Sequence, residues 1–156
     1  MAASPGDRIR ATVATLETTT SESPLVRPGR PHAIGWGTVE LDRAARELAI
    51  DLGFAPDAFA PAADSLALGA RCRVARDALP GGLALAILEP ATEGRLAAML
   101  ARHGEGPAVV WFASDDASPD LAASPGPFGP ERPDPGAPAD GQRWFLIGPG
   151  AGTIPT

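Results

Sequence analysis

The sequence predicts an α+β fold with a mainly antiparallel sheet. Two segments place apolar residues at helical spacing, and several short apolar runs have the length and β-branched content of strands. Along the chain, the order is strand, helix, three strands, helix, strand, loop and strand, which is typical of α+β proteins. At 156 residues, the chain has room for one domain with one hydrophobic core.

The N-terminal segment is predicted to form a strand and a linker. In RIRATVATLE (residues 8–17), Ile9, Ala11 and Val13 alternate with more polar residues, as in a half-buried strand. The polar stretch that follows contains three prolines and has no period. We therefore expect an N-terminal strand and linker over residues 1–30 and the main domain over residues 31–156.

The next two elements are predicted to be a buried strand and an amphipathic helix. HAIGWGTV (residues 32–39) is apolar and contains glycine, as in a central strand that another backbone or a ligand approaches closely. ELDRAARELAIDLGF (residues 40–54) then predicts a helix that ends at Gly53. Its apolar positions at helical spacing are Leu41, Ala44, Ala45, Leu48 and Leu52.

Three short strands and a second helix are expected next. The strands are SLALG, RCRVARD and LALAILEP, with the turn LPGG before the last of them. Thr92 is in position to cap the helix, and Gly104 is in position to end it. The apolar side of this helix is expected to consist of Leu96, Met99 and Leu100.

The last third of the chain predicts two strands separated by a long loop. AVVWFA and RWFLIG have the composition of strands. Between them, residues 115–142 contain seven prolines and no sustained period. A loop of this length in a compact domain is usually functional or disordered.

Composition excludes several classes of function. The net charge of −6 is unfavourable for nucleic-acid binding, which requires a concentrated positive surface. No apolar run approaches the roughly 20 residues that span a bilayer, and Cys72 has no second cysteine to pair with, so we expect a cytoplasmic protein without membrane contact. Lysine, tyrosine and asparagine are absent, which indicates a GC-rich bacterial genome and excludes a Schiff base or a P-loop.

Two sequence segments resemble those of a known superfamily. VELDRAARELAIDLGF after the first strand of the main domain, and LEPATEGRLAAMLARHGEGP after the fourth, resemble the glyoxalase and bleomycin-resistance group, also called the vicinal-oxygen-chelate superfamily. Its methylmalonyl-CoA epimerase branch carries a similar LEP…HGEG segment between two βαβββ modules. The resemblance covers roughly residues 32–112 and implies a cup-shaped sheet open to a ligand.

The resemblance also implies one divalent metal held by four side chains. His32 corresponds to the first ligand of the family, the histidine that opens the first strand. Ala86 and Val109 occupy the next two ligand positions. The fourth ligand, a glutamate near the end of the family's domain, has no counterpart in RWFLIG. One donor does not hold a metal. We therefore expect the fold without a metal or another cofactor. The proline-rich stretch also shortens the second module, and either the N-terminal strand or a second chain would fill the gap.

Several residues are candidates for a binding surface in the cup. If His32 faces the cup, alternation places Trp36 beside it, and Val109 similarly brings Trp111, so that the two indoles would form a ligand surface. The alternative is that both tryptophans are core residues. Arg73, on the same face of its strand as Arg71, could bind an anionic group or lie in solvent.

Glu89 is the candidate acid or base. At the end of its strand, it could act as a general base whose pKa is raised by apolar neighbours. The alternative assigns the acidic and basic groups of this region to helix termini, with Glu93 at the start of the second helix and His103 at its end. Cys72 is expected to pack as a small buried hydrophobe.

These observations lead to three functional hypotheses. The first is metal-independent binding of a small organic ligand by a homodimer, through Trp36, Trp111 and Arg73. The second is a lyase, isomerase or epimerase acting on a small carbonyl compound, with His32 and Glu89 transferring protons or sharing a metal across a dimer. The third is an interaction protein that has lost its site and uses the proline-rich loop.

Overall fold

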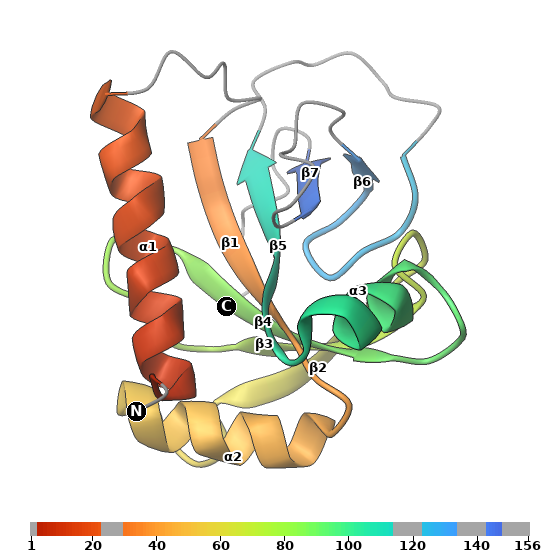
Figure 1. Cartoon of the computed structure of the whole chain (residues 1–156), viewed down its shortest axis with the longest axis horizontal. Helices are drawn as coiled ribbons and strands as arrows, with labels where there is room; N and C mark the ends of the chain where they lie inside the picture. The colour runs from red at the N-terminus through yellow and green to blue at the C-terminus, as the bar shows by residue number, and fades with distance from the viewer. Residues whose placement is uncertain (1–2, 23–29, 114–122, 134–142, 148–156) are drawn as a thin grey trace.

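The computed structural model describes residues 3–22, 30–113, 123–133 and 143–147, which form a curled seven-stranded sheet and three helices (Figure 1). The helices are α1 (Pro5–Glu22), α2 (Leu41–Leu52) and α3 (Arg95–His103). The strands are β1 (Arg30–Gly37), β2 (Phe59–Ser65), β3 (Ala70–Ala75), β4 (Ala84–Pro90), β5 (Gly106–Ala113), β6 (Glu131–Pro133) and β7 (Arg143–Ile147).

The strand order is β2-β3-β4-β1-β5-β7-β6. Of the six pairs that join these strands, β1–β4 and β5–β7 are parallel and the other four are antiparallel. The elements β1, α2, β2, β3 and β4 form one complete βαβββ module. The α+β fold with a mainly antiparallel cup-shaped sheet is therefore confirmed.

Helix α2 ends as its sequence predicts. Gly53 has a left-handed backbone with φ of 72°, which glycine adopts without steric cost. The N–H of Phe54 donates to the Ala49 carbonyl at 2.8 Å, and the N–H of Gly53 donates to the Ile50 carbonyl at 3.3 Å. These two bonds form a Schellman motif that satisfies the last carbonyls of the helix.

The sheet buries a different apolar cluster on each side. The side covered by α1 and α2, the helix face, packs residues such as Ile34, Leu48 and Phe112 together. The opposite side, the cup face, packs Val109, Trp111 and Phe145 with Leu96 of α3. The chain therefore has two buried layers, and the face on which a side chain lies decides whether it can reach a ligand in the cup.

The N-terminal segment is a helix, so the strand predicted for it is wrong. Ile9, Val13 and Leu16, spaced by four and three residues, are buried against the helix face. Ile9 and Val13 fit a strand period and a helical period equally well, but Leu16 fits only the helical one. The spacing of all three residues therefore indicates a helix, and the strand prediction failed because it considered Ile9 and Val13 without Leu16.

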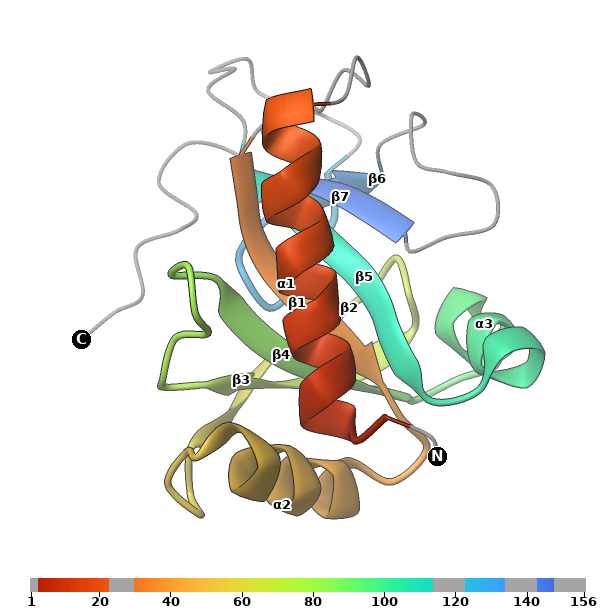
Figure 2. The same ribbon diagram turned by 60° about the vertical axis from the view of Figure 1, so that its left-hand side comes forward.

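Helix α1 takes the place of a missing part of the second module. After β5, the described residues contain β6 and β7 and no helix that follows β5 in sequence. Helix α1 instead lies across β1 and β5 (Figure 2), in one cluster with Val110, Phe112 and Leu146. The N-terminal segment thus covers the gap in the second module, but on a face of the sheet rather than as an added strand.

Two local predictions also need correction. The strand expected at SLALG (residues 65–69) is wrong, because residues 66–69 form a turn and the strand, β2 (Phe59–Ser65), precedes it. Proline is tolerated at position 61 because β2 is an edge strand. Thr92 does not cap α3, which begins at Arg95 after Gly94. Instead, the Leu68 carbonyl accepts a hydrogen bond from the Leu96 N–H at 3.2 Å, and Gly104 ends the helix as predicted.

Among the described helices, none is long and apolar enough to cross a membrane.

Candidate functional site

A β-bulge in β1 determines which predicted residues face the cup. Pro31 pairs with Phe112 and Ala33 pairs with Trp111, so His32 is an extra residue that has no partner position on β5. A bulge resets the alternation of side chains between the two faces. As a result, His32 lies on the cup face, whereas Ile34 and Trp36 belong to the helix face. The prediction that Trp36 lies beside His32 is therefore wrong.

His32 is a half-buried histidine with an unsatisfied ring nitrogen. Its Nε2 is buried and has no hydrogen-bond partner in the described part of the chain. Burial lowers the pKa of the imidazole below its usual value, so the neutral form is favoured near pH 7. The ring packs edge-on against Phe128, with centroids 5.3 Å apart. A buried nitrogen of this kind is where a ligand could make a hydrogen bond.

Trp111 faces the cup, as predicted, and binds a carboxyl group that the sequence did not reveal. Its Nε1–H donates to Oε1 of Glu131 at 3.0 Å, while Ser65 Oγ–H donates to Oε2 at 2.8 Å. Glu131 is fully buried. Burial raises the pKa of this carboxyl, and the two hydrogen bonds only partly oppose the shift.

Glu131 lies within the predicted proline-rich loop, at the start of the three-residue strand β6. The stretch GPERP has no alternation or helical spacing, so no sequence signal distinguished this glutamate from a solvated loop residue. Its carboxyl packs directly against Gly126, where any Cβ would overlap Oε1. Glycine at position 126 therefore allows the segment to close around the carboxyl.

Phe128 connects His32 and Trp111. Its ring contacts both the His32 imidazole and the Trp111 indole, the latter at a centroid distance of 4.9 Å, and Phe145 lies against Trp111 from β7. Edge-to-face pairs of this kind add to the stability gained from area burial. The cup face thus combines an aromatic cluster with two titratable groups, His32 and Glu131.

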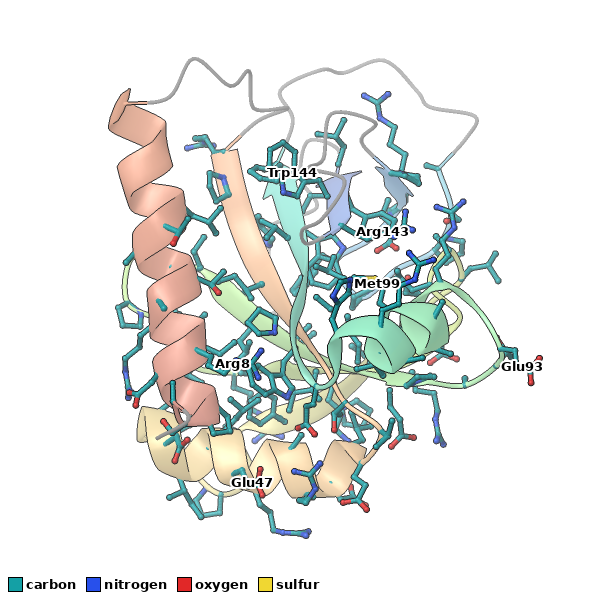
Figure 3. The ribbon with its side chains drawn as sticks, in the orientation of Figure 1. Arg8, Glu47, Glu93, Met99, Arg143 and Trp144 are labelled. Carbon is teal, nitrogen blue, oxygen red and sulfur yellow. The ribbon has the colours of Figure 1, made fainter. Side chains whose placement is uncertain are left out.

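Arg143 provides a positive charge on the same side of the sheet. It precedes Phe145 by two residues on β7, so alternation places both side chains on the cup face. Arg143 is exposed, and Figure 3 shows it on the side of the sheet that carries α3 and Met99.

Trp36 serves a structural role on the helix face. Its side chain is 1% exposed, its Nε1–H donates to Glu105 at 3.1 Å, and the guanidinium of Arg8 lies 5.2 Å from its ring centre. Glu105 also pairs with Arg43 of α2 at 2.7 Å. Burial opposes the charged form of Glu105, but the hydrogen bonds from Arg43 and Trp36 outweigh it and lower the pKa of the carboxyl. This network ties α1 and α2 to the sheet.

The structure does not bring Glu89 and Arg73 to the cup face. Glu89 accepts a hydrogen bond from the N–H of Leu41 at 2.8 Å and forms an ion pair with Arg71, so it stabilises the start of α2. Arg73 pairs with Asp42, also on α2, at 2.6 Å. Within this chain, both residues attach α2 to the sheet.

Cys72 lies on the cup face as a buried hydrophobe, as predicted. Burial and the nearby Glu131 and Asp64 charges raise the pKa of its thiol to about 12, so it remains protonated at neutral pH.

The donor set of the cup face does not fit a metal ion. The positions that would supply ligands next to His32 hold Ala86 and Val109, while β7 contributes Phe145 and Ile147 to the same face. Residues 3–22, 30–113, 123–133 and 143–147 contain no group of three or more histidine, cysteine or acidic side chains that could hold a metal. We therefore derive no reaction step through a metal.

Comparison with known proteins gives structural matches only. No protein-family model matches the sequence, and no curated protein sequence matches it significantly. A methylmalonyl-CoA epimerase of Streptomyces coelicolor, in complex with 2-nitronate-propionyl-CoA, has a TM-score of 0.60 and 20% identity over 78% of this chain and 98% of the other. The epimerase of Mycobacterium tuberculosis has a TM-score of 0.58 and 18% identity over 82% and 91% of the two chains.

A hypothetical protein from Bacillus halodurans matches with a TM-score of 0.57 and 14% identity over 78% of this chain and 95% of the other. At these identities, the matches establish the fold and leave the activity open. The chain therefore has the fold of the glyoxalase and bleomycin-resistance superfamily.

Proposed function

We propose that this protein binds a small organic ligand on the cup face without a metal ion. The observation that supports this proposal is the buried Nε2 of His32, which has no hydrogen-bond partner among the described residues and lies beside the aromatic cluster of Trp111 and Phe128. Binding sites of this kind combine apolar walls with a few placed polar groups. A ligand oxygen could satisfy His32, an apolar portion could pack on Trp111, and Arg143 could bind an anionic group.

The ligands of similar structures suggest the first compound to test. One epimerase of this fold was solved with methylmalonyl-CoA, which carries a carboxylate, a thioester carbonyl and phosphates. Isothermal titration calorimetry with methylmalonyl-CoA, in buffer containing EDTA, tests the proposal directly. We expect saturable binding that weakens about tenfold or more in His32→Ala, the cost of losing one buried hydrogen bond.

The matched control is His103→Ala. His103 is exposed on α3, so this variant also loses one histidine but leaves the cup face unchanged, and its ligand affinity should equal that of the wild type. Equal affinity of the wild type and His32→Ala for methylmalonyl-CoA would contradict the proposal. Binding that is seen in buffer without EDTA and lost when EDTA is present would also contradict it.

A second candidate function is epimerisation or a related isomerisation of a small carbonyl compound. It is favoured by two titratable groups on one face, a neutral His32 and a Glu131 whose pKa is raised. His32 Nε2 could remove a proton from the carbon next to a carbonyl, and protonated Glu131 could return one to the same carbon. Each turnover in D₂O would then replace one hydrogen of the substrate with deuterium.

Mass spectrometry of methylmalonyl-CoA incubated with the protein in D₂O tests this second function. Exchange that is lost in Glu131→Gln supports it, and the absence of exchange in the wild type refutes it. Loss in Glu89→Gln alone would instead support proton transfer by Glu89 of the partner subunit in a homodimer. Native mass spectrometry of the wild type tests whether that dimer forms.

A further inference from the structure

We infer that residues 123–133, which we call the plug, occupy the ligand site of the cup face and must leave before a ligand binds. This inference rests on the first proposed function, ligand binding, and excludes the second, which needs Glu131 in the site while the substrate is bound. The plug contributes Phe128 and Glu131 to the cup face, and both are buried there. The site is therefore filled by the chain's own side chains.

The plug is held by strand pairing and by a few side-chain and backbone contacts. Its last three residues form the edge strand β6, and the pairing of this strand with β7 must also break when the plug leaves. The Pro125 carbonyl accepts a hydrogen bond from the Leu66 N–H at 3.1 Å, and Glu131 is held by Trp111 and Ser65. Phe128 supplies the aromatic contacts. The two hydrogen bonds between Ser124 and Glu131 are internal to the plug and would not be lost if it moved as a unit.

The fit of the plug is imperfect at two places. Phe128 presents hydrocarbon to His32 and leaves the buried Nε2 without a partner. Glu131 carries an ionisable carboxyl into a site where burial disfavours its charge. Unmade hydrogen bonds and buried ionisable groups both oppose the closed state, so a better-matched ligand can compete with the plug.

The geometry of the plug indicates which ligands can displace it. A competing ligand needs a flat apolar or aromatic portion to replace Phe128 against Trp111 and a hydroxyl or carbonyl oxygen within reach of His32 Nε2. Because the plug occupies this site in the free protein, the measured affinity equals the intrinsic affinity multiplied by the fraction of molecules in which the plug is open.

Cys72 is a built-in reporter of plug opening. It is the only cysteine in the sequence, it is 4% exposed, and it lies close enough to Glu131 for that charge to raise the pKa of its thiol. Ellman's reagent reacts with exposed thiolates. The rate at which this reagent labels Cys72 below the unfolding transition therefore measures opening without any ligand.

Two variants should release the plug, and one should leave it in place. Gly126→Ala puts a Cβ where Glu131 Oε1 lies, and Ser65→Ala removes the hydroxyl that donates to Oε2. Pro130→Ala, at an exposed position of the same segment, is the matched control. We expect labelling about tenfold faster in the first two variants, consistent with the loss of one buried hydrogen bond, and unchanged in the control.

Ligand affinity is then measured with the fluorescent probe 8-anilinonaphthalene-1-sulfonate and with methylmalonyl-CoA. Faster labelling together with about tenfold tighter binding of either compound, as expected when a closed state is depopulated, supports the inference. Equal labelling of all four proteins overturns it, as does faster labelling with unchanged affinity. Urea denaturation of each variant identifies labelling that arises from global unfolding. Faster labelling with no binding by any of the four proteins supports plug release and refutes the proposed function.

Discussion

The indole N–H of Trp111 donates to the Glu131 carboxyl at 3.0 Å, and both residues are fully buried. This bond joins strand β5 to strand β6 through two residues that lie 20 positions apart in sequence. It holds a titratable group in a buried position against the aromatic cluster of the cup face.

Trp111→Phe should destabilise the protein because it leaves Glu131 Oε1 without its donor. We expect the free energy of unfolding to fall by about 1–3 kcal/mol, the usual cost of an unsatisfied buried polar atom. Urea denaturation measures the change. A double-mutant cycle with Glu131→Gln should give a coupling of at least about 0.5 kcal/mol, and strict additivity would show that the bond has no energetic role.

The stability of the protein should fall as pH rises above the ordinary range of glutamate. The pKa of Glu131 is raised above 4.5 in the folded state, so the folded protein holds a proton that the unfolded chain releases. The stabilising contribution is full below 4.5 and is lost as pH rises through the raised pKa. Urea denaturation across this window should show the decline in the wild type and a smaller one in Glu131→Gln. The same slope in both proteins would contradict the assignment.

Trp36→Ala should unfold or strongly destabilise the protein, by about 3–5 kcal/mol, since a fully buried indole is removed from the helix face. If Trp36 lay in the cup, as the alternation of β1 predicts, the same substitution would instead abolish ligand binding and leave the fold intact. Trp36→Phe is the milder variant and should keep ligand affinity unchanged while losing the bond to Glu105. A folded Trp36→Ala protein that fails only to bind ligand would restore the original assignment.

Ile9→Ala should cost about 2–4 kcal/mol of stability because the Ile9 side chain is fully buried between α1 and the sheet. Ala11→Gly, at an exposed position of the same helix, should cost only about 1 kcal/mol through the lower helix propensity of glycine. Thermal unfolding followed by circular dichroism measures both changes. An Ile9→Ala protein as stable as the wild type would show that α1 does not pack on the sheet.

Much of the fold could be predicted because its signals are local. The spacing of Leu41, Ala44 and Leu48 and the glycine at 53 predict α2, and the apolar runs predict β1, β3, β4, β5 and β7. The failure at α1 has a physical cause, since Ile9 and Val13 satisfy both periods. Leu16, which the strand prediction left out, fits only the helical period.

The site was less predictable than the fold. Trp111 and His32 were assigned to the cup, and the structure places both there. Trp36 was misassigned because a single bulge residue reverses every side chain after it, and no residue type in PHAIGW marks the bulge. Glu131 was missed because its role depends on contacts with Trp111 and Ser65, which are distant in sequence.

The place of α1 has a consequence for how the chain folds. Ile9 and Val13 share a cluster with Val110, Phe112 and Leu146, roughly a hundred residues later in sequence, so closing this contact carries a high entropic cost. A helix of 18 residues is only marginally stable in water by itself. We therefore expect α1 to dock late, after β5 and β7 have paired, and the apolar strip that it covers to be the surface through which a partly folded chain aggregates.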